Sequence, residues 1–130
     1  MDDISIFVFY MSFSEDIKRQ VWDKARTEPG LDENMFRKDA CGAWIMWEKY
    51  GNRENVFGWE IDHVFPVRLG GDDNIENLRA LHCLNNASKG DDYPSYMAAV
   101  TAEGYDNIRK KREMTVNADL KEKLKHLYNK

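Results

Sequence analysis

Residues 59–90 read WEIDHVFPVRLGGDDNIENLRALHCLNNASKG, and turn residues divide this stretch into short segments. Residues 59–65 are rich in β-forming side chains and end at a proline, and residues 78–82 alternate between apolar and polar types, so both segments predict strands. The glycine pair at 70–71 predicts a loop between them, because glycine tolerates positive φ. Residues 84–89 predict a short helix that the next glycine ends. The expected order is strand, loop, strand, helix.

Other segments of the chain carry weaker signals. Apolar residues at helical spacing behind a serine N-cap predict a helix over 15–27. An apolar run over 41–47 predicts a short strand or turn. Residues 95–103 and 106–128 are expected to be helical, the second rich in lysine. Residues 1–13 are either an edge strand or a dispensable leader.

The length and composition favour one globular domain. The chain has 130 residues, of which 42% are hydrophobic and 12% aromatic, enough for a packed core. No apolar run approaches the roughly 20 residues of a membrane-spanning helix, and the first basic residue is Lys18, so neither a membrane anchor nor a secretory signal is expected. Two cysteines exclude a disulfide framework. A cytoplasmic protein is therefore expected.

The net charge of −4 is unevenly distributed. Residues 1–100 carry 11 Lys and Arg against 18 Asp and Glu, whereas residues 101–130 carry 8 against 5. An acidic body argues against broad attraction to nucleic acid. The basic tail either grips a nucleic-acid backbone or forms a solvated helix face, and the sequence leaves both open.

The residues between 62 and 90 suggest hydrolysis of a phosphodiester. Carboxylate and carboxamide oxygens, as in Asp62 and Asn86, are hard ligands suited to Mg²⁺ or Mn²⁺. The imidazole of His63 can accept a proton from water near neutral pH. Lys89 follows Asn86 by three positions, on the same helical face, within reach of a phosphate. One metal, one base and one cation are the parts that such a reaction needs.

The same stretch resembles the HNH endonuclease family, which has a ββα-metal fold. The resemblance rests on the following residues: Glu60-Ile61-Asp62-His63, Pro66, Gly70-Gly71, Asn77-Leu78, Leu81, Asn86 and Lys89-Gly90. The lead-in residues 37–45 and 50–53 also look like those of small single-domain bacterial or phage HNH proteins. The whole chain would then be one α+β nuclease domain. An N-terminal helix and lead-in at 14–58 would precede the ββα-metal core at 59–90, and C-terminal helices at 95–130 would follow it.

The resemblance implies a role for each matching residue. Asp62 falls at the first metal-ligand position and His63 at the general-base position. Asn77 matches the middle asparagine, which ties the loop together and orients the base. Asn86 matches the second metal ligand, so that one Mg²⁺ or Mn²⁺ ion would be held by Asp62 and Asn86.

Three further side chains complete the expected site. Lys89 and Arg79 are expected to bind the substrate. Glu60 shares a strand face with Asp62 and either assists the metal or is an ordinary surface carboxylate, the reading we favour.

One departure from the family concerns zinc. Many members carry two CxxC pairs that hold a structural zinc, and those positions here hold Cys41, Trp44, His82 and Asn85. Because three of the four cysteines are missing, we expect no structural zinc. Packing of Trp44, Trp47 and Trp59 around Cys41 is expected to replace it.

The predicted activity is metal-dependent endonucleolytic cleavage of DNA. Two alternatives remain open from the sequence. One is a catalytically silent nucleic-acid-binding module of the same fold, and the other is a nuclease that acts on RNA.

Overall fold

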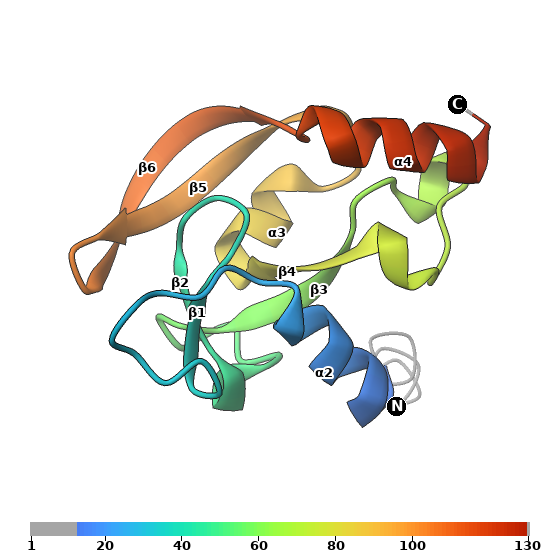
Figure 1. Ribbon diagram of the computed structural model, residues 1–130. Coiled ribbons are helices and arrows are strands. Elements are labelled where there is room, and N and C mark those ends of the chain that lie inside the picture. Colours follow the sequence, from blue (N-terminus) through green and yellow to red (C-terminus); the bar gives the residue numbers. More distant parts are fainter. Residues whose placement is uncertain (1–12, 130) are drawn as a thin grey trace, which may run out of the picture.

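The protein is a mixed α+β molecule in the computed structural model, which describes residues 13–129 (Figure 1). Within that range, three helices and three two-stranded antiparallel sheets follow one another along the chain. The predicted α+β class is confirmed. The leader or edge strand expected at the N-terminus lies, except for Phe13, outside the described residues.

The segment that carries the sequence signal forms a β-hairpin followed by a helix. Strand β3 (Trp59–His63) pairs antiparallel with β4 (Leu78–His82), and α3 (Cys83–Lys89) begins at the next residue. The predicted order of strand, loop, strand and helix is confirmed. The loop folds back tightly: a Cβ on Gly71 would lie 1.8 Å from the carbonyl oxygen of Phe65, so only glycine is accommodated there.

The N-terminal half packs a helix and a small hairpin against this core. Helix α2 (Glu15–Asp23) is shorter than the predicted helix over 15–27, because the backbone of Arg26 pairs with Lys38 at the end of β1. Strand β1 (Phe36–Lys38) pairs antiparallel with β2 (Trp44–Met46). The short strand predicted within 41–47 is therefore present.

The C-terminal part corrects the prediction from sequence. Residues 95–103 and 106–128 were expected to be helical, but β5 (Ser95–Glu103) and β6 (Asp106–Thr115) form a long antiparallel hairpin, and only α4 (Ala118–Tyr128) is helical. Alternate side chains in the first half of β5 are buried, and this two-residue period fits a strand with one face on the core.

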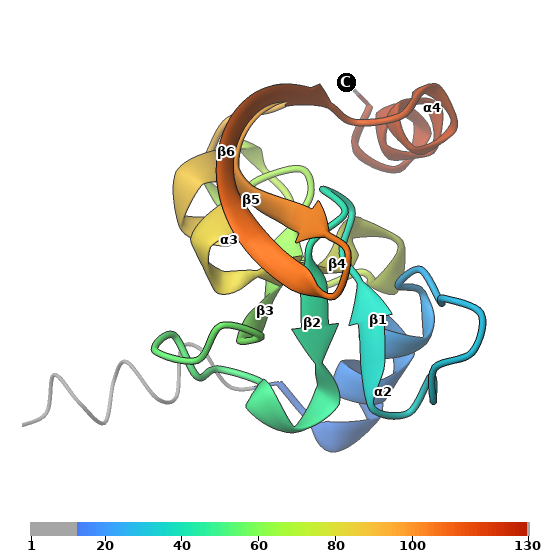
Figure 2. The ribbon, with the colours of Figure 1, turned by 90° about the vertical axis from the view of Figure 1, so that its left-hand side faces the viewer.

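Helix α3 lies at the centre of the fold, between the β3–β4 hairpin and the β5–β6 hairpin, which curves over it (Figures 1 and 2). The buried apolar residues form two clusters. One contains Cys41, Val64, Phe65, Leu81, Tyr96, Ala98, Val116 and Leu124. The other contains Val21, Trp22, Ile45, Trp59, Ile61, Leu78 and Ala80. The β5–β6 hairpin and α4 both contribute residues to the first cluster, so they belong to the core of the domain.

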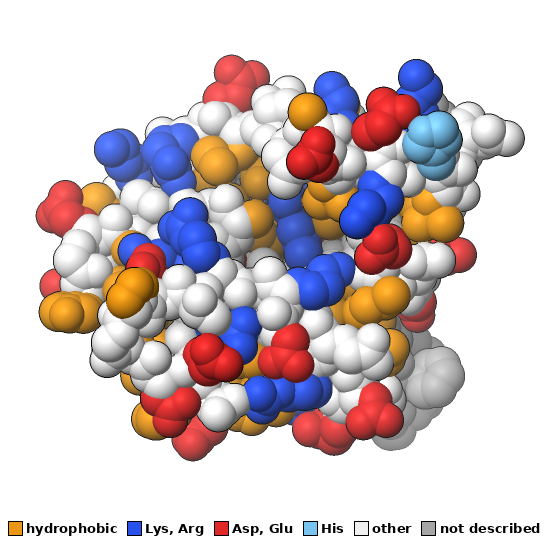
Figure 3. All heavy atoms as spheres, viewed as in Figure 1, with side chains coloured by type: hydrophobic (Ala, Val, Ile, Leu, Met, Phe, Trp, Pro, Cys, Tyr) orange, Lys and Arg blue, Asp and Glu red, His pale blue; other side chains and the backbone are white. Residues whose placement is uncertain are grey.

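The described helices are all too short or too polar to cross a membrane. On the face shown in Figure 3, lysine and arginine side chains are interspersed with carboxylates. A surface of mixed sign does not create a strong field for a polyanion, so contacts with one would depend on individually placed cations.

Candidate active site

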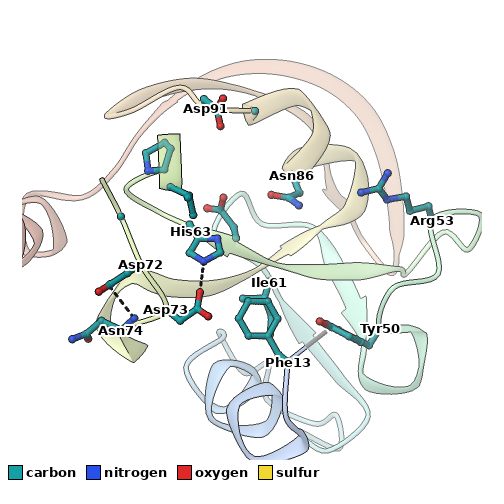
Figure 4. Close-up of a pocket in the computed structure, with 15 residues that line it drawn as sticks. Phe13, Tyr50, Arg53, Ile61, His63, Asp72, Asp73, Asn74, Asn86 and Asp91 are labelled. Atoms are coloured by element: carbon teal, nitrogen blue, oxygen red, sulfur yellow. Dashed lines mark hydrogen bonds and ion pairs between the residues drawn. The ribbon is translucent and has the colours of Figure 1, made fainter. Parts of the chain in front are cut away.

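A hollow of about 1060 Å³ opens where β3 ends (Figure 4). Its walls come from the loop around residues 50–53, from β3, from the loop that joins β3 to β4, and from the C-terminal end of α3. Asp62, His63 and Asn86 all line it. The structure thus brings together three of the side chains that the sequence singled out.

Asp62 is held by two cations, the buried Lys89 and the partly buried Arg79. Its Oδ2 accepts a hydrogen bond from Arg79 Nε at 3.1 Å, directly across the β3–β4 pair, and its Oδ1 lies 3.3 Å from Lys89 Nζ. Burial lowers the pKa of Lys89 from its ordinary value, and the Asp62 carboxylate acts in the opposite direction. The carboxylate therefore has a fixed position on the wall of the hollow.

This arrangement corrects the expected role of Lys89 and Arg79. Lys89 is only 1% exposed and also donates to the carbonyl oxygen of His63. Neither Lys89 nor Arg79 lines the hollow. Both cations pair with Asp62 from positions outside the lining of the hollow, so neither is placed to contact a substrate phosphate there.

His63 stands at the end of β3 and is partly exposed. Its Nε2 lies 2.7 Å from Asp73 Oδ1, a pair drawn as a dashed line in Figure 4. When Nε2 carries the proton and donates a hydrogen bond to Asp73, Nδ1 is left with the lone pair that a general base requires. Asp73 was not identified from the sequence, and its signal was the acidic pair that follows the two glycines of the loop.

Asn77 lies behind the loop and is fully buried. Its Oδ1 accepts from the Phe65 N–H at 2.7 Å, while its Nδ2 donates to the carbonyl oxygens of Phe65 and Asp72 at 3.0 and 3.1 Å. One side chain thus joins the start of the loop to its far part, the loop-tying role expected from the resemblance. Asn77 does not line the hollow itself.

Glu60 orients Asn86. The carboxylate of Glu60 was expected on the surface, but it is buried. Glu60 is 3% exposed, and its Oε1 accepts from Asn86 Nδ2 at 2.8 Å. The side-chain amide oxygen of Asn86, Oδ1, has no hydrogen-bond partner among the described residues and remains available, whereas its backbone carbonyl oxygen accepts from the Gly90 N–H. Glu60 Oε2 accepts from Arg53 Nε, so the same buried carboxylate also holds an arginine that lines the hollow.

A single carboxylate occupies the place where packing of tryptophans around Cys41 was expected. Asp39 Oδ1 accepts from the N–H groups of Cys41 and Ala43, and Oδ2 accepts from the His82 N–H and Asn85 Nδ2, all at 2.8–3.0 Å. These contacts join residues 39–43 to residues 82–85.

The expected packing of the tryptophans is wrong. Trp47 and Trp59 pack against Trp22 instead, and Trp44 stacks on Tyr105. Cys41 belongs to the other apolar cluster. A hydrogen-bonded Asp39, and not an aromatic cluster, fills the centre of this region.

The donor atoms in the hollow are compatible with a hard divalent cation. A carboxylate offers about four lone-pair positions, of which Arg79 and Lys89 use two at Asp62. Asn86 adds an amide oxygen, and Mg²⁺ commonly binds one or two protein ligands and keeps several waters. No group of three or more His, Cys, Asp or Glu side chains within residues 13–129 is arranged to hold a metal. The fit therefore rests on Asp62 and Asn86.

Comparisons with protein-family models, with curated proteins and with solved structures found no match to this chain. A function for this chain is therefore inferred from the residues of the hollow and from their contacts.

Proposed function

We propose that the protein is a metal-dependent endonuclease that hydrolyses phosphodiester bonds in DNA, built on a ββα-metal core formed by β3, β4 and α3. The observation that carries this proposal is the convergence of Asp62, His63 and Asn86 on one hollow, with His63 bonded to Asp73. The resemblance of residues 59–90 to HNH endonucleases supports the same chemistry.

In the proposed reaction, His63 Nδ1 removes a proton from water as the water oxygen forms a bond to phosphorus and the bond from phosphorus to the 3′ oxygen breaks. Asp73 holds the imidazole in the required tautomer and stabilises it when it becomes charged. Asp62 and Asn86 would hold one Mg²⁺ or Mn²⁺ ion. When bound, that ion supplies charge stabilisation to the phosphate and to the leaving oxygen.

The first test follows cleavage of supercoiled plasmid with Mg²⁺, Mn²⁺ or excess EDTA, beside matched single-stranded DNA and RNA. We expect nicking only with an added ion. Undiminished cleavage in EDTA would overturn the role of the metal. Binding of labelled DNA without cleavage would identify a silent binding module, and cleavage of RNA alone would identify an RNA nuclease.

Variants separate the base from the ligand. His63→Ala should slow cleavage by about 10²–10⁴, the usual contribution of a positioned general base, while Mn²⁺ affinity stays close to that of the wild type. Asp62→Asn should lose both cleavage and Mn²⁺ affinity, because it removes the charged ligand. His126→Ala is the control, since His126 is exposed on α4 and its single ion pair within residues 13–129 is with Glu122. Near-normal turnover in His63→Ala would place the base elsewhere.

DNA as the partner, a cytoplasmic location and the absence of structural zinc remain predictions from the sequence. Elemental analysis of protein purified without chelator checks the last of these. A stoichiometric zinc would contradict this prediction and indicate a site formed by Cys41, His82 or Cys83.

A further inference from the structure

The charges around the hollow are unbalanced for a nucleic-acid substrate. Four aspartates line it: Asp62, Asp72, Asp73 and Asp91. Among the described residues, Arg53 is the single lysine or arginine that does so. A phosphodiester strand entering the hollow would meet carboxylates on most sides, so a cation on the wall has a strong effect on where its phosphates can lie.

The guanidinium of Arg53 is anchored at one atom and open at the others. Its Nε donates to Glu60 Oε2, and the side chain of Glu60 is only 4% exposed, whereas that of Arg53 is 57% exposed. Within residues 13–129, Nη1 and Nη2 make no hydrogen bond. The bond to Glu60 also raises the pKa of Arg53 above its ordinary value, so the group stays charged. The Nη1–Nη2 edge of the anchored guanidinium is therefore free to donate two N–H groups to the oxygens of a phosphate.

The anchor also links Arg53 to the proposed metal ligand Asn86. Glu60 holds Arg53 through Oε2 and Asn86 through Oε1, so the arginine and the proposed metal ligand share one carboxylate. Figure 4 shows Arg53 and Asn86 on one side of the hollow, with His63 and Asp73 on the other. Arg53 thus lies beside the proposed metal ligand and away from the proposed base.

We propose that Arg53 forms a phosphate-binding subsite, which holds a backbone phosphate adjacent along the strand to the one that is attacked. This inference rests on the proposed nuclease function. It transfers to Arg53 the substrate contact that the sequence suggested for Lys89 and Arg79, since both of those cations are directed to Asp62.

Binding measurements test the subsite apart from catalysis. In the His63→Ala background, a fluorescein-labelled DNA duplex is titrated with protein in Mg²⁺ at several salt concentrations. Adding Arg53→Gln should weaken binding and make the negative slope of log K against log salt shallower by about 0.9, which corresponds to the loss of one phosphate contact. Arg68→Gln is the matched control: it removes the same charge from the neighbouring loop, and Arg68 is highly exposed and does not line the hollow.

Kinetics distinguish a phosphate contact from a positioning effect through Glu60. Arg53→Gln should raise KM about tenfold, in line with the loss of a charge-assisted hydrogen bond, and leave kcat and Mn²⁺ affinity within about twofold. Arg53→Lys keeps the charge but loses the paired N–H donors of the guanidinium. Its KM should therefore lie between those of the wild type and Arg53→Gln. Circular dichroism and thermal unfolding show whether each variant is folded.

Three outcomes overturn the proposal. An unchanged KM and salt slope would show that Arg53 does not touch the substrate. A fall in kcat and Mn²⁺ affinity with unchanged salt slope would show that Arg53 acts only by positioning Asn86. An equal change of KM and salt slope in Arg68→Gln would show that the effect comes from the net charge of the protein and not from a contact of Arg53. Failure of the wild type to cleave or bind any nucleic acid would instead refute the nuclease function itself.

Discussion

Buried carboxylates organise this protein at the scale of single residues. Asp39, Glu60 and Asp62 are each less than 5% exposed, and each accepts hydrogen bonds on both of its oxygens or pairs with two cations. A buried charge is costly unless it is paired in this way. Each of these side chains therefore fixes the position of its neighbours, and two of them belong to the proposed site.

Asp39 is expected to be essential for stability although it lies outside the hollow. Asp39→Ala leaves four N–H donors without their acceptor, which should lower the free energy of unfolding by about 3 kcal/mol or more. Urea denaturation followed by tryptophan fluorescence measures the change. The control is Asp92→Ala, which removes an exposed carboxylate from a turn. Equal stability of the two variants would contradict the role given to Asp39.

At the scale of elements, the C-terminal helix is joined to the loop of the proposed site. Tyr128 of α4 stacks on Phe65, its hydroxyl donates to Asp72 Oδ1, and its oxygen accepts from the Asp72 N–H. Asp72 precedes Asp73, the partner of His63. Helix α4 thus restrains the segment that orients the proposed base, which a separable basic tail would not do.

Tyr128→Phe tests this restraint, since it removes the hydroxyl and keeps the ring on Phe65. Because the loop would become more mobile, we expect kcat to fall severalfold while Mn²⁺ affinity is retained. Tyr93→Phe is the matched control, because Tyr93 also packs on Phe65 but makes no bond to Asp72. Equal kcat in both variants would show that α4 does not influence the base.

The same variant has a pH-dependent effect on stability. The hydrogen bond from Tyr128 lowers the pKa of Asp72 below its ordinary value. The stabilisation is therefore present above the unfolded-state pKa of aspartate and is lost as pH falls through the lower folded-state value. The difference in Tm between wild type and Tyr128→Phe should be largest near neutral pH and disappear in acid.

At the scale of the whole molecule, the two cysteines report on the integrity of the fold. Burial raises the pKa of Cys41 to about 11 and that of Cys83 to about 12. Cys41 lies in the apolar cluster that the C-terminal elements complete, and Cys83 begins α3. Neither thiol forms a disulfide.

Both thiols should therefore resist modification while the protein is folded, because the thiolate is the reactive form. At pH 7, Ellman's reagent should label neither cysteine in the native protein and both in urea. In a destabilised variant such as Asp39→Ala, the two cysteines should become reactive at a lower urea concentration than in the wild type. Rapid labelling of the native wild type would contradict the burial of these two positions.

Local signals were sufficient for the central part of the fold. The β-rich run before Pro66, the alternation in 78–82 and the glycine after Lys89 act over a few residues each, and β3, β4 and α3 follow them closely. The same short stretch contains Asp62, His63 and Asn86, so their common position depends on one hairpin and one turn.

The sequence by itself therefore determined the hairpin, the helix after it and three residues of the candidate site. Only the tertiary structure decided that residues 95–115 are strands, that Asp39 joins two distant segments, and that Arg53, not Lys89 or Arg79, faces the hollow. The physical reason is the range of the interactions. Turn and strand preferences act between neighbours in the chain, whereas burial, strand pairing and the partner of each charge depend on residues that meet only after folding.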